Sequence, residues 1–72
     1  MDIQKGKEKF KELVRAYENG VSAGYITKGD PARTNKIDGA WEVLSAIGVP
    51  YEEIVKLVDE AKRKSAAEFA NR

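Results

Sequence analysis

The stretch from Asp30 to Ile47 most constrains how this chain folds, because it carries a complete helix signature around the only tryptophan. Asp30 suits the position before a helix, where a carboxylate accepts hydrogen bonds from free amides, and Pro31 needs no amide partner at the first helical position. Apolar side chains then recur at helical spacing over a wide arc, at Ile37, Ala40, Trp41, Leu44 and Ile47. We therefore predict a central helix over residues 31–47, with Trp41 in the core.

The apolar arc of this helix is wider than one neighbouring helix would cover. Val43 and Ala46 extend it, so that more than half of the circumference is apolar. A helix of this kind contacts two neighbours or a partner molecule. If the other helices leave Val43 and Ala46 uncovered, these residues form an association surface, and burial within the chain is the alternative.

A first amphipathic helix is predicted over residues 3–19. Charged side chains occupy about half of its positions, and apolar ones follow helical spacing at Phe10, Leu13, Val14 and Tyr17. Gly20 is expected to end this helix in a left-handed conformation. Residues 21–29 contain two glycines and several β-branched side chains, which favours a connector. Tyr25 and Ile26 are expected to pack from this connector against the core.

A third helix is predicted over residues 50–70. Glu52 and Glu53 suit the positive end of its dipole. An apolar stripe follows at helical spacing, at Tyr51, Ile54, Leu57, Val58, Ala61 and Phe69. With 72 residues the chain forms one domain, residues 1–72. The predicted fold is all-α, a small three-helix bundle whose core is thin because short chains bury only about 60 % of their surface.

The composition removes the usual means of catalysis and metal binding. The chain has no cysteine and no histidine, so it lacks thiolate ligands, the commonest metal ligand and the commonest general base. Neighbouring carboxylates such as Glu52 and Glu53 point in different directions from a helix. Asp38 and Glu42, at helical spacing, offer a cation only two carboxylates. We predict no enzymatic activity, no catalytic residue, no cofactor and no metal site.

Charge and hydropathy patterning also limit the location and the partners. No apolar segment approaches the about 20 residues of a membrane span, and none follows the charged N-terminus as in a signal peptide. We therefore expect a cytoplasmic protein without membrane contact, and the absence of cysteine is compatible with the reducing cytosol. The net charge of +1 is a smaller basic excess than nucleic-acid binders usually carry.

The segment between the second and third helices resembles the helix-turn-helix signature, over the run from Leu44 to Leu57. Gly48 occupies the position of the turn glycine in this signature, and Val49 follows it. Apolar residues occupy the inward positions of the next helix. The resemblance implies a sharp corner between the helices and, in its functional form, nucleic-acid binding.

In that alternative function, Tyr51 and Lys56 would contact nucleic acid and the basic first helix would contact phosphates. Glu52 and Glu53 oppose it, because they would face phosphates at the start of the recognition helix. Arg, Asn and Gln side chains that read bases are also absent there.

A cluster of basic and aromatic side chains lies around the start of the central helix, at Tyr25, Lys28, Arg33 and Lys36. An aromatic ring among cations suits an acidic protein surface or a phosphate, and a hydrated polar turn is the alternative. We favour a small non-enzymatic accessory protein that binds another protein through this cluster. Homodimerisation through the second or third helix, and a role as a structural subunit of a homo-oligomeric assembly, stay open.

Overall fold

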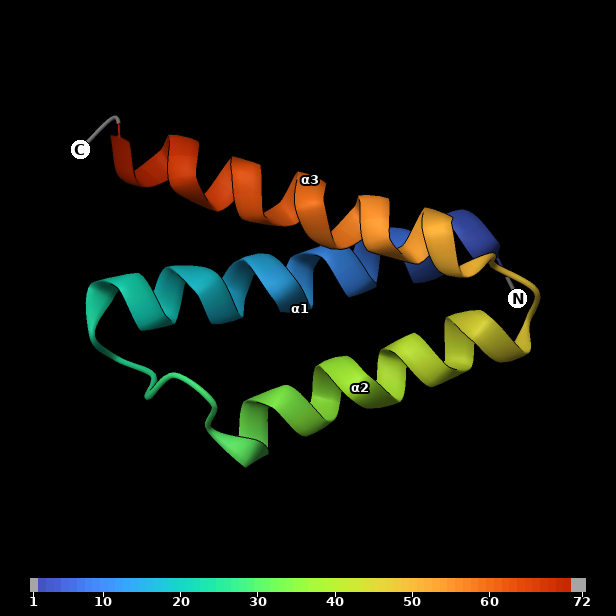
Figure 1. Cartoon of the computed structure of the whole chain (residues 1–72), viewed down its shortest axis with the longest axis horizontal. Coiled ribbons are helices and arrows are strands. Elements are labelled where there is room, and N and C mark those ends of the chain that lie inside the picture. Colours follow the sequence, from blue (N-terminus) through green and yellow to red (C-terminus); the bar gives the residue numbers. More distant parts are fainter. Residues whose placement is uncertain (1, 71–72) are drawn as a thin grey trace.

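The computed structural model describes residues 2–70, which form three helices (Figure 1). Helix α1 spans Ile3–Ala23, α2 spans Pro31–Ala46 and α3 spans Tyr51–Ala70. In Figure 1, α1 lies between the other two helices, α2 runs antiparallel to it and α3 runs parallel to it. The predicted all-α, three-helix architecture is confirmed, and α1 rather than α2 makes most of the contacts between helices.

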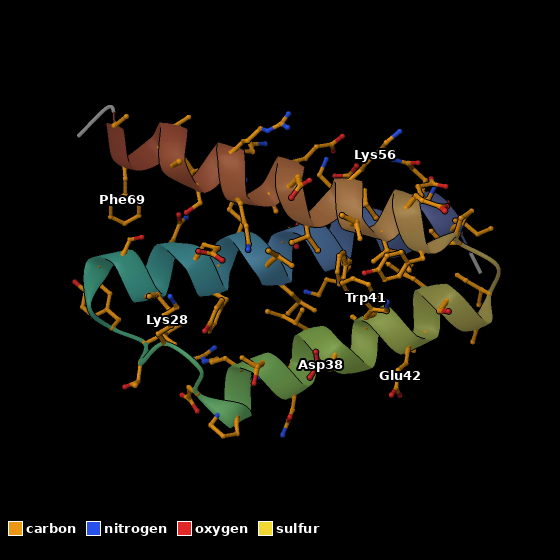
Figure 2. The ribbon with its side chains drawn as sticks, in the orientation of Figure 1. Lys28, Asp38, Trp41, Glu42, Lys56 and Phe69 are labelled. Carbon is orange, nitrogen blue, oxygen red and sulfur yellow. The ribbon has the colours of Figure 1, made fainter. Side chains whose placement is uncertain are left out.

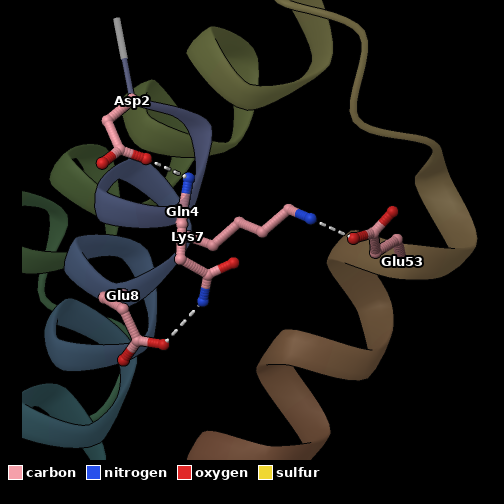
Figure 3. Close-up of polar contacts among 5 residues, drawn as sticks. All are labelled: Asp2, Gln4, Lys7, Glu8 and Glu53. Carbon is pink, nitrogen blue, oxygen red and sulfur yellow. Dashed lines mark hydrogen bonds and ion pairs between the residues drawn. The ribbon is translucent and has the colours of Figure 1, made fainter.

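The first two helices begin at aspartate caps. The Asp30 carboxylate accepts a hydrogen bond of 3.0 Å from the N–H of Ala32, with Pro31 at the first position of α2. The Asp2 carboxylate caps α1 in the same way, since it accepts from the N–H of Gln4 at 3.0 Å (Figure 3). Such caps are worth about 1 kcal/mol each. The predicted start of α2 is confirmed.

The end of α1 differs from the prediction, because the helix continues through Gly20 and is capped at Gly24. Gly24 has a φ of 83°, in the left-handed region. Gly20 instead permits a close approach: a Cβ at this position would lie only 2.6 Å from Cγ1 of Ile26. The Gly20 carbonyl also accepts the N–H groups of Tyr25 and Ile26, at 2.9 and 3.1 Å. Glycine is therefore needed at position 20 because Ile26 packs against it, and not because the backbone there is left-handed.

Alanine substitutions at two helical glycines are expected to have opposite effects. No atom lies within 4 Å of the place that a Cβ of Gly39 would take, so Gly39→Ala should raise the free energy of unfolding by about 1 kcal/mol. Gly20→Ala has the same propensity gain but drives a methyl group into Ile26, and should lower stability. Urea unfolding followed by circular dichroism measures both changes. An equal gain in the two variants would show that Ile26 does not pack on Gly20.

The core lies mainly along the contact between α1 and α3. Phe10 of α1 and Ile54 of α3 are both 0 % exposed. The other buried apolar side chains surround them and are Val14, Leu44, Val49, Leu57 and Ala61. Helix α2 contributes only Leu44 to this set. Helix α2 therefore covers one side of a core that α1 and α3 build.

Trp41 lies at the edge of this core and not at its centre. It is partly buried and packs edge-on against Phe10, with ring centroids 6.1 Å apart and planes at 82°. On its other side it contacts the ring of Tyr51, at 5.7 Å. Figure 2 shows Trp41 directed from α2 toward the other helices, near the corner. The prediction that α2 is the central helix is wrong, because α1 packs against both other helices and Trp41 packs against the core only from its edge. Leu13, Tyr17 and Val58, on the predicted apolar faces of the first and third helices, are likewise only partly buried.

Polar pairs join the parallel helices α1 and α3 along their length. Lys7 of α1 pairs with Glu53 of α3 (Figure 3), and Asn19 accepts the hydroxyl of the buried Ser65. Two other ion pairs join the same helices: Lys11 with Glu60 at 3.1 Å, and Arg15 with Glu68 at 3.6 Å. Because these pairs are partly exposed, each contributes at most about 1 kcal/mol. Their main effect is to fix how α3 is placed along α1.

Candidate interaction surfaces

The four residues of the predicted basic and aromatic cluster are all exposed, and two of them, Tyr25 and Lys28, lie on the connector. Tyr25 is 88 % exposed, so the prediction that it packs against the core is wrong. The left-handed turn at Gly24 directs Ile26, rather than Tyr25, onto Gly20. Lys28 is exposed on the connector, at the end of the bundle away from Trp41 (Figure 2).

Arg33 and Lys36 take part in a different arrangement, because both line a small hollow between α1 and α2. The hollow has a volume of about 60 Å³, and its other walls are Leu13, Ala16, Tyr17 and Ile26. The Tyr17 hydroxyl accepts the N–H of Gly29 at 2.7 Å, which ties the connector to α1 beside this hollow. The structure thus brings Arg33 and Lys36 together against α1 and leaves Tyr25 and Lys28 outside.

A second and larger hollow lies between the same two helices, nearer the corner. Its volume is about 240 Å³, and it is lined by Gly6, Lys9, Phe10, Ala40, Val43, Leu44 and Ile47. Apart from Lys9, this lining is apolar. Val43 is 50 % exposed at its edge, and Ala46 is exposed as well. The predicted condition for an association surface on α2 is therefore met.

The two hollows follow one another along the contact between α1 and α2, and we call them together the α1–α2 groove. Lys9 and Leu13 are one turn apart on α1, and Ala40 and Lys36 are one turn apart on α2. From Gly6 to Tyr17 the α1 wall is about 17 Å long at 1.5 Å per residue. The groove has an apolar floor toward the corner and a more polar end toward the connector.

The charges that line the α1–α2 groove are all positive. Lys9 lies at the apolar end, and Arg33 and Lys36 lie at the other end. Within residues 2–70, no carboxylate lines either hollow, and neither Arg33 nor Lys36 takes part in an ion pair. The acidic residues of α2 lie on its other side, where Glu42 points away from the other two helices (Figure 2). Helix α2 therefore presents an apolar and basic edge to the groove and an acidic edge to solvent.

Sequence reasoning found half of this groove. The wide apolar arc pointed to Val43, and the basic cluster pointed to Arg33 and Lys36. The α1 wall was missed. A Cβ at Gly6 would lie 3.5 Å from Leu44 Cδ2, which is an ordinary van der Waals distance, so Gly6 lines the groove without glycine being required there.

Two local features of the corner between α2 and α3 match its helix-turn-helix resemblance. Gly48 has a φ of 101°, and Val49 is buried, with its N–H donating to the Leu44 carbonyl at 3.0 Å. The residues predicted to face nucleic acid are also exposed, Tyr51 at 69 % and Lys56 on the outer side of α3. Tyr51, however, already has a structural role, because its ring packs on Trp41.

The surroundings of these residues are mixed in charge. Lys56 borders a shallow hollow together with Asp59, Glu60 and Arg63. On α1, the cations Lys7, Lys11 and Arg15 pair with carboxylates of α3 and are not free for phosphates. A nucleic-acid interface would have to break these pairs or work around them.

The carboxylates considered for catalysis or metal binding are dispersed. Glu53 and Glu60 each pair with a lysine of α1, whereas Asp38 and Glu42 are exposed on α2. Among residues 2–70 no group of three or more acidic side chains is placed to hold a metal ion. In the same part of the chain, no helix is both long enough and apolar enough to cross a membrane.

Comparison of the chain with protein-family models, with curated proteins and with solved structures found no match. A function must therefore be argued from the surface itself. The α1–α2 groove is the part of that surface where shape, apolar character and charge coincide.

Proposed function

We propose that this protein is a small, non-enzymatic interaction module that binds another protein through the α1–α2 groove. The observation that carries the proposal is the half-exposed Val43 above an apolar hollow of about 240 Å³. A chain of 72 residues has few apolar side chains beyond those that its core needs. Leaving Val43 and Ala46 uncovered on the same helix is typical of a surface that a partner covers.

The proposal includes a cytoplasmic location, in keeping with a chain that has no cysteine. The proposed contact surface is the α1–α2 groove and not the whole predicted cluster. Arg33 and Lys36 remain contact residues because they line this groove. Tyr25 and Lys28 are flanking residues, because they are exposed on the connector and line neither hollow.

Site-specific photocrosslinking in the cells that produce the chain tests this proposal. With p-benzoylphenylalanine in place of Val43, we expect a discrete crosslinked species of higher mass. Ser45 is the matched control, since it is exposed on the polar side of the same helix, and the probe there should give no such species. The same crosslinked species from both positions, or none from either, would contradict binding through the groove.

Nucleic-acid binding through Tyr51 and Lys56 is the alternative function, supported by the helix-turn-helix-like corner and opposed by the neighbouring carboxylates. We expect a labelled DNA duplex to show no change in fluorescence anisotropy at low salt, where phosphate contacts are strongest. Binding that weakens steeply with salt and is lost in Lys56→Glu would favour this alternative. Lys62→Glu, also on exposed α3 surface, controls for the change of net charge.

A further inference from the structure

We propose that the partner of the α1–α2 groove is an amphipathic helix that carries acidic residues beside its apolar face. This inference rests on the proposed protein-binding function and adds the chemical class of the ligand. Three properties of the groove support it: its length, the division of its lining into an apolar end and a more polar end, and the sign of its charges.

The groove has the dimensions of a site for a short helix. Its α1 wall, from Gly6 to Tyr17, corresponds to about 17 Å, or about eleven residues of a helix lying alongside. The apolar end is open at Val43 and has Phe10 and Leu44 in its floor. Helices that bind in grooves insert apolar side chains from positions i, i+3, i+4 and i+7, and an opening of this length takes two or three of them.

The charges select an acidic helix over a neutral or basic one. Lys9 stands beside the apolar hollow, and its own carboxylate neighbour, Glu12, is 4.0 Å away, with both side chains largely exposed. Arg33 and Lys36 stand at the other end without an ion pair to another described residue. Carboxylates that flank the apolar face of the ligand would meet a cation at each end of the groove. This complementarity favours correct orientation and faster association.

The same charges argue against a second copy of the groove as the occupant. In a two-fold symmetric contact, each residue of one copy meets the equivalent surface of the other. The cations of one groove, Lys9, Arg33 and Lys36, would then face cations of the other groove across an apolar contact. The phosphates of nucleic acid would match the cations but would leave the apolar floor, formed by Phe10 and Leu44, without a complement.

A displayed library of amphipathic helical peptides tests the inference with the full-length chain as bait. The library varies the flanking positions among Asp, Glu, Asn, Gln, Lys and Arg and the apolar positions among Leu, Ile, Phe and Ala. We expect enrichment of peptides with large apolar residues at helical spacing and with Asp or Glu beside them. Val43→Glu should weaken the enriched peptides by about tenfold or more. Ser45→Glu, the same change on the polar side of α2, should leave their affinity within about twofold.

The charge requirement is tested separately in the same peptides. Arg33→Glu combined with Lys36→Glu should weaken binding by about tenfold or more. Lys62→Glu combined with Arg63→Glu gives the same change of net charge on exposed α3 surface and should have little effect. Binding to the wild-type chain should also weaken as salt is raised.

The outcomes separate this inference from the function on which it rests. Enriched peptides that are neutral or basic, yet lost in Val43→Glu, would overturn the acidic ligand and retain the groove. Peptides insensitive to Val43→Glu, or no enrichment at all, would overturn the groove as well. A concentration-dependent dimer in sedimentation equilibrium that Val43→Glu dissolves would show that the groove binds a second copy instead.

Discussion

Phe10→Ala is expected to remove most of the stability of this domain. Phe10 is 0 % exposed and packs edge-on against Trp41 from the helix that contacts both others. Truncation of a buried phenylalanine costs about 3–5 kcal/mol, through lost burial and the cavity that remains. At roughly 0.05–0.15 kcal/mol per residue, a chain of 72 residues has about 4–11 kcal/mol in total. Thermal unfolding followed by circular dichroism should show a greatly lowered or absent transition.

Tyr25→Ala is the matched control for this prediction, because it removes an aromatic ring that is 88 % exposed. Its melting temperature should stay close to that of the wild type. Trp41→Ala should fall between the two, since Trp41 is only partly buried at the edge of the core. If Phe10→Ala melts near the wild-type temperature, or Trp41→Ala is the more damaging change, the core is centred on α2 and not on α1.

Local signals were sufficient to predict the three helices. Asp30 and Pro31 mark the start of α2 in any context, because capping and the missing proline amide act within one turn. The same holds for the glycine corner, where Gly48 adopts a positive φ. These features depend on neighbours in sequence, and the sequence alone contains those neighbours.

The end of α1 was predicted wrongly for a physical reason. Gly20 and Gly24 are both suited to a left-handed cap, and local propensity does not distinguish them strongly. What separates them is tertiary: Ile26 returns onto Gly20, so that glycine is needed there inside the helix. A contact across six residues of chain, through a turn that was not yet placed, lies beyond periodicity arguments.

In the candidate site, too, local signals were visible in the sequence and tertiary contacts were not. The apolar arc of α2 was too wide for one neighbour, which left Val43 either uncovered or buried within the chain, and the structure shows it half exposed. The α1 wall could not be foreseen, since it depends on how α1 and α2 are rotated against each other. The overestimate of Trp41 has a related origin, because the number and size of apolar residues on α2 did not reveal that α1 lies between the other two helices.

Ile54→Ala is the second change expected to have a large effect, because it tests the other half of the core. Ile54 is 0 % exposed in the first turn of α3, directly after the corner that holds the buried Val49. Its N–H donates to the Pro50 carbonyl at 3.1 Å, so the side chain is presented at the point where α3 begins. Removing it should cost about 2–5 kcal/mol. Urea unfolding should show a lower midpoint without a large change in slope.

Ile3→Ala is the matched control, because it removes the same side chain from a position near the start of α1 that is 45 % exposed. The two variants therefore differ in the burial of the side chain and not in its type. Ile3→Ala should cost less than about 1 kcal/mol, since much of its surface stays in water. The difference between the two variants then measures how tightly α3 is held against α1 at the corner. Equal effects at the two positions would mean that the α1–α3 contact does not carry the core, and α2 would have to supply it.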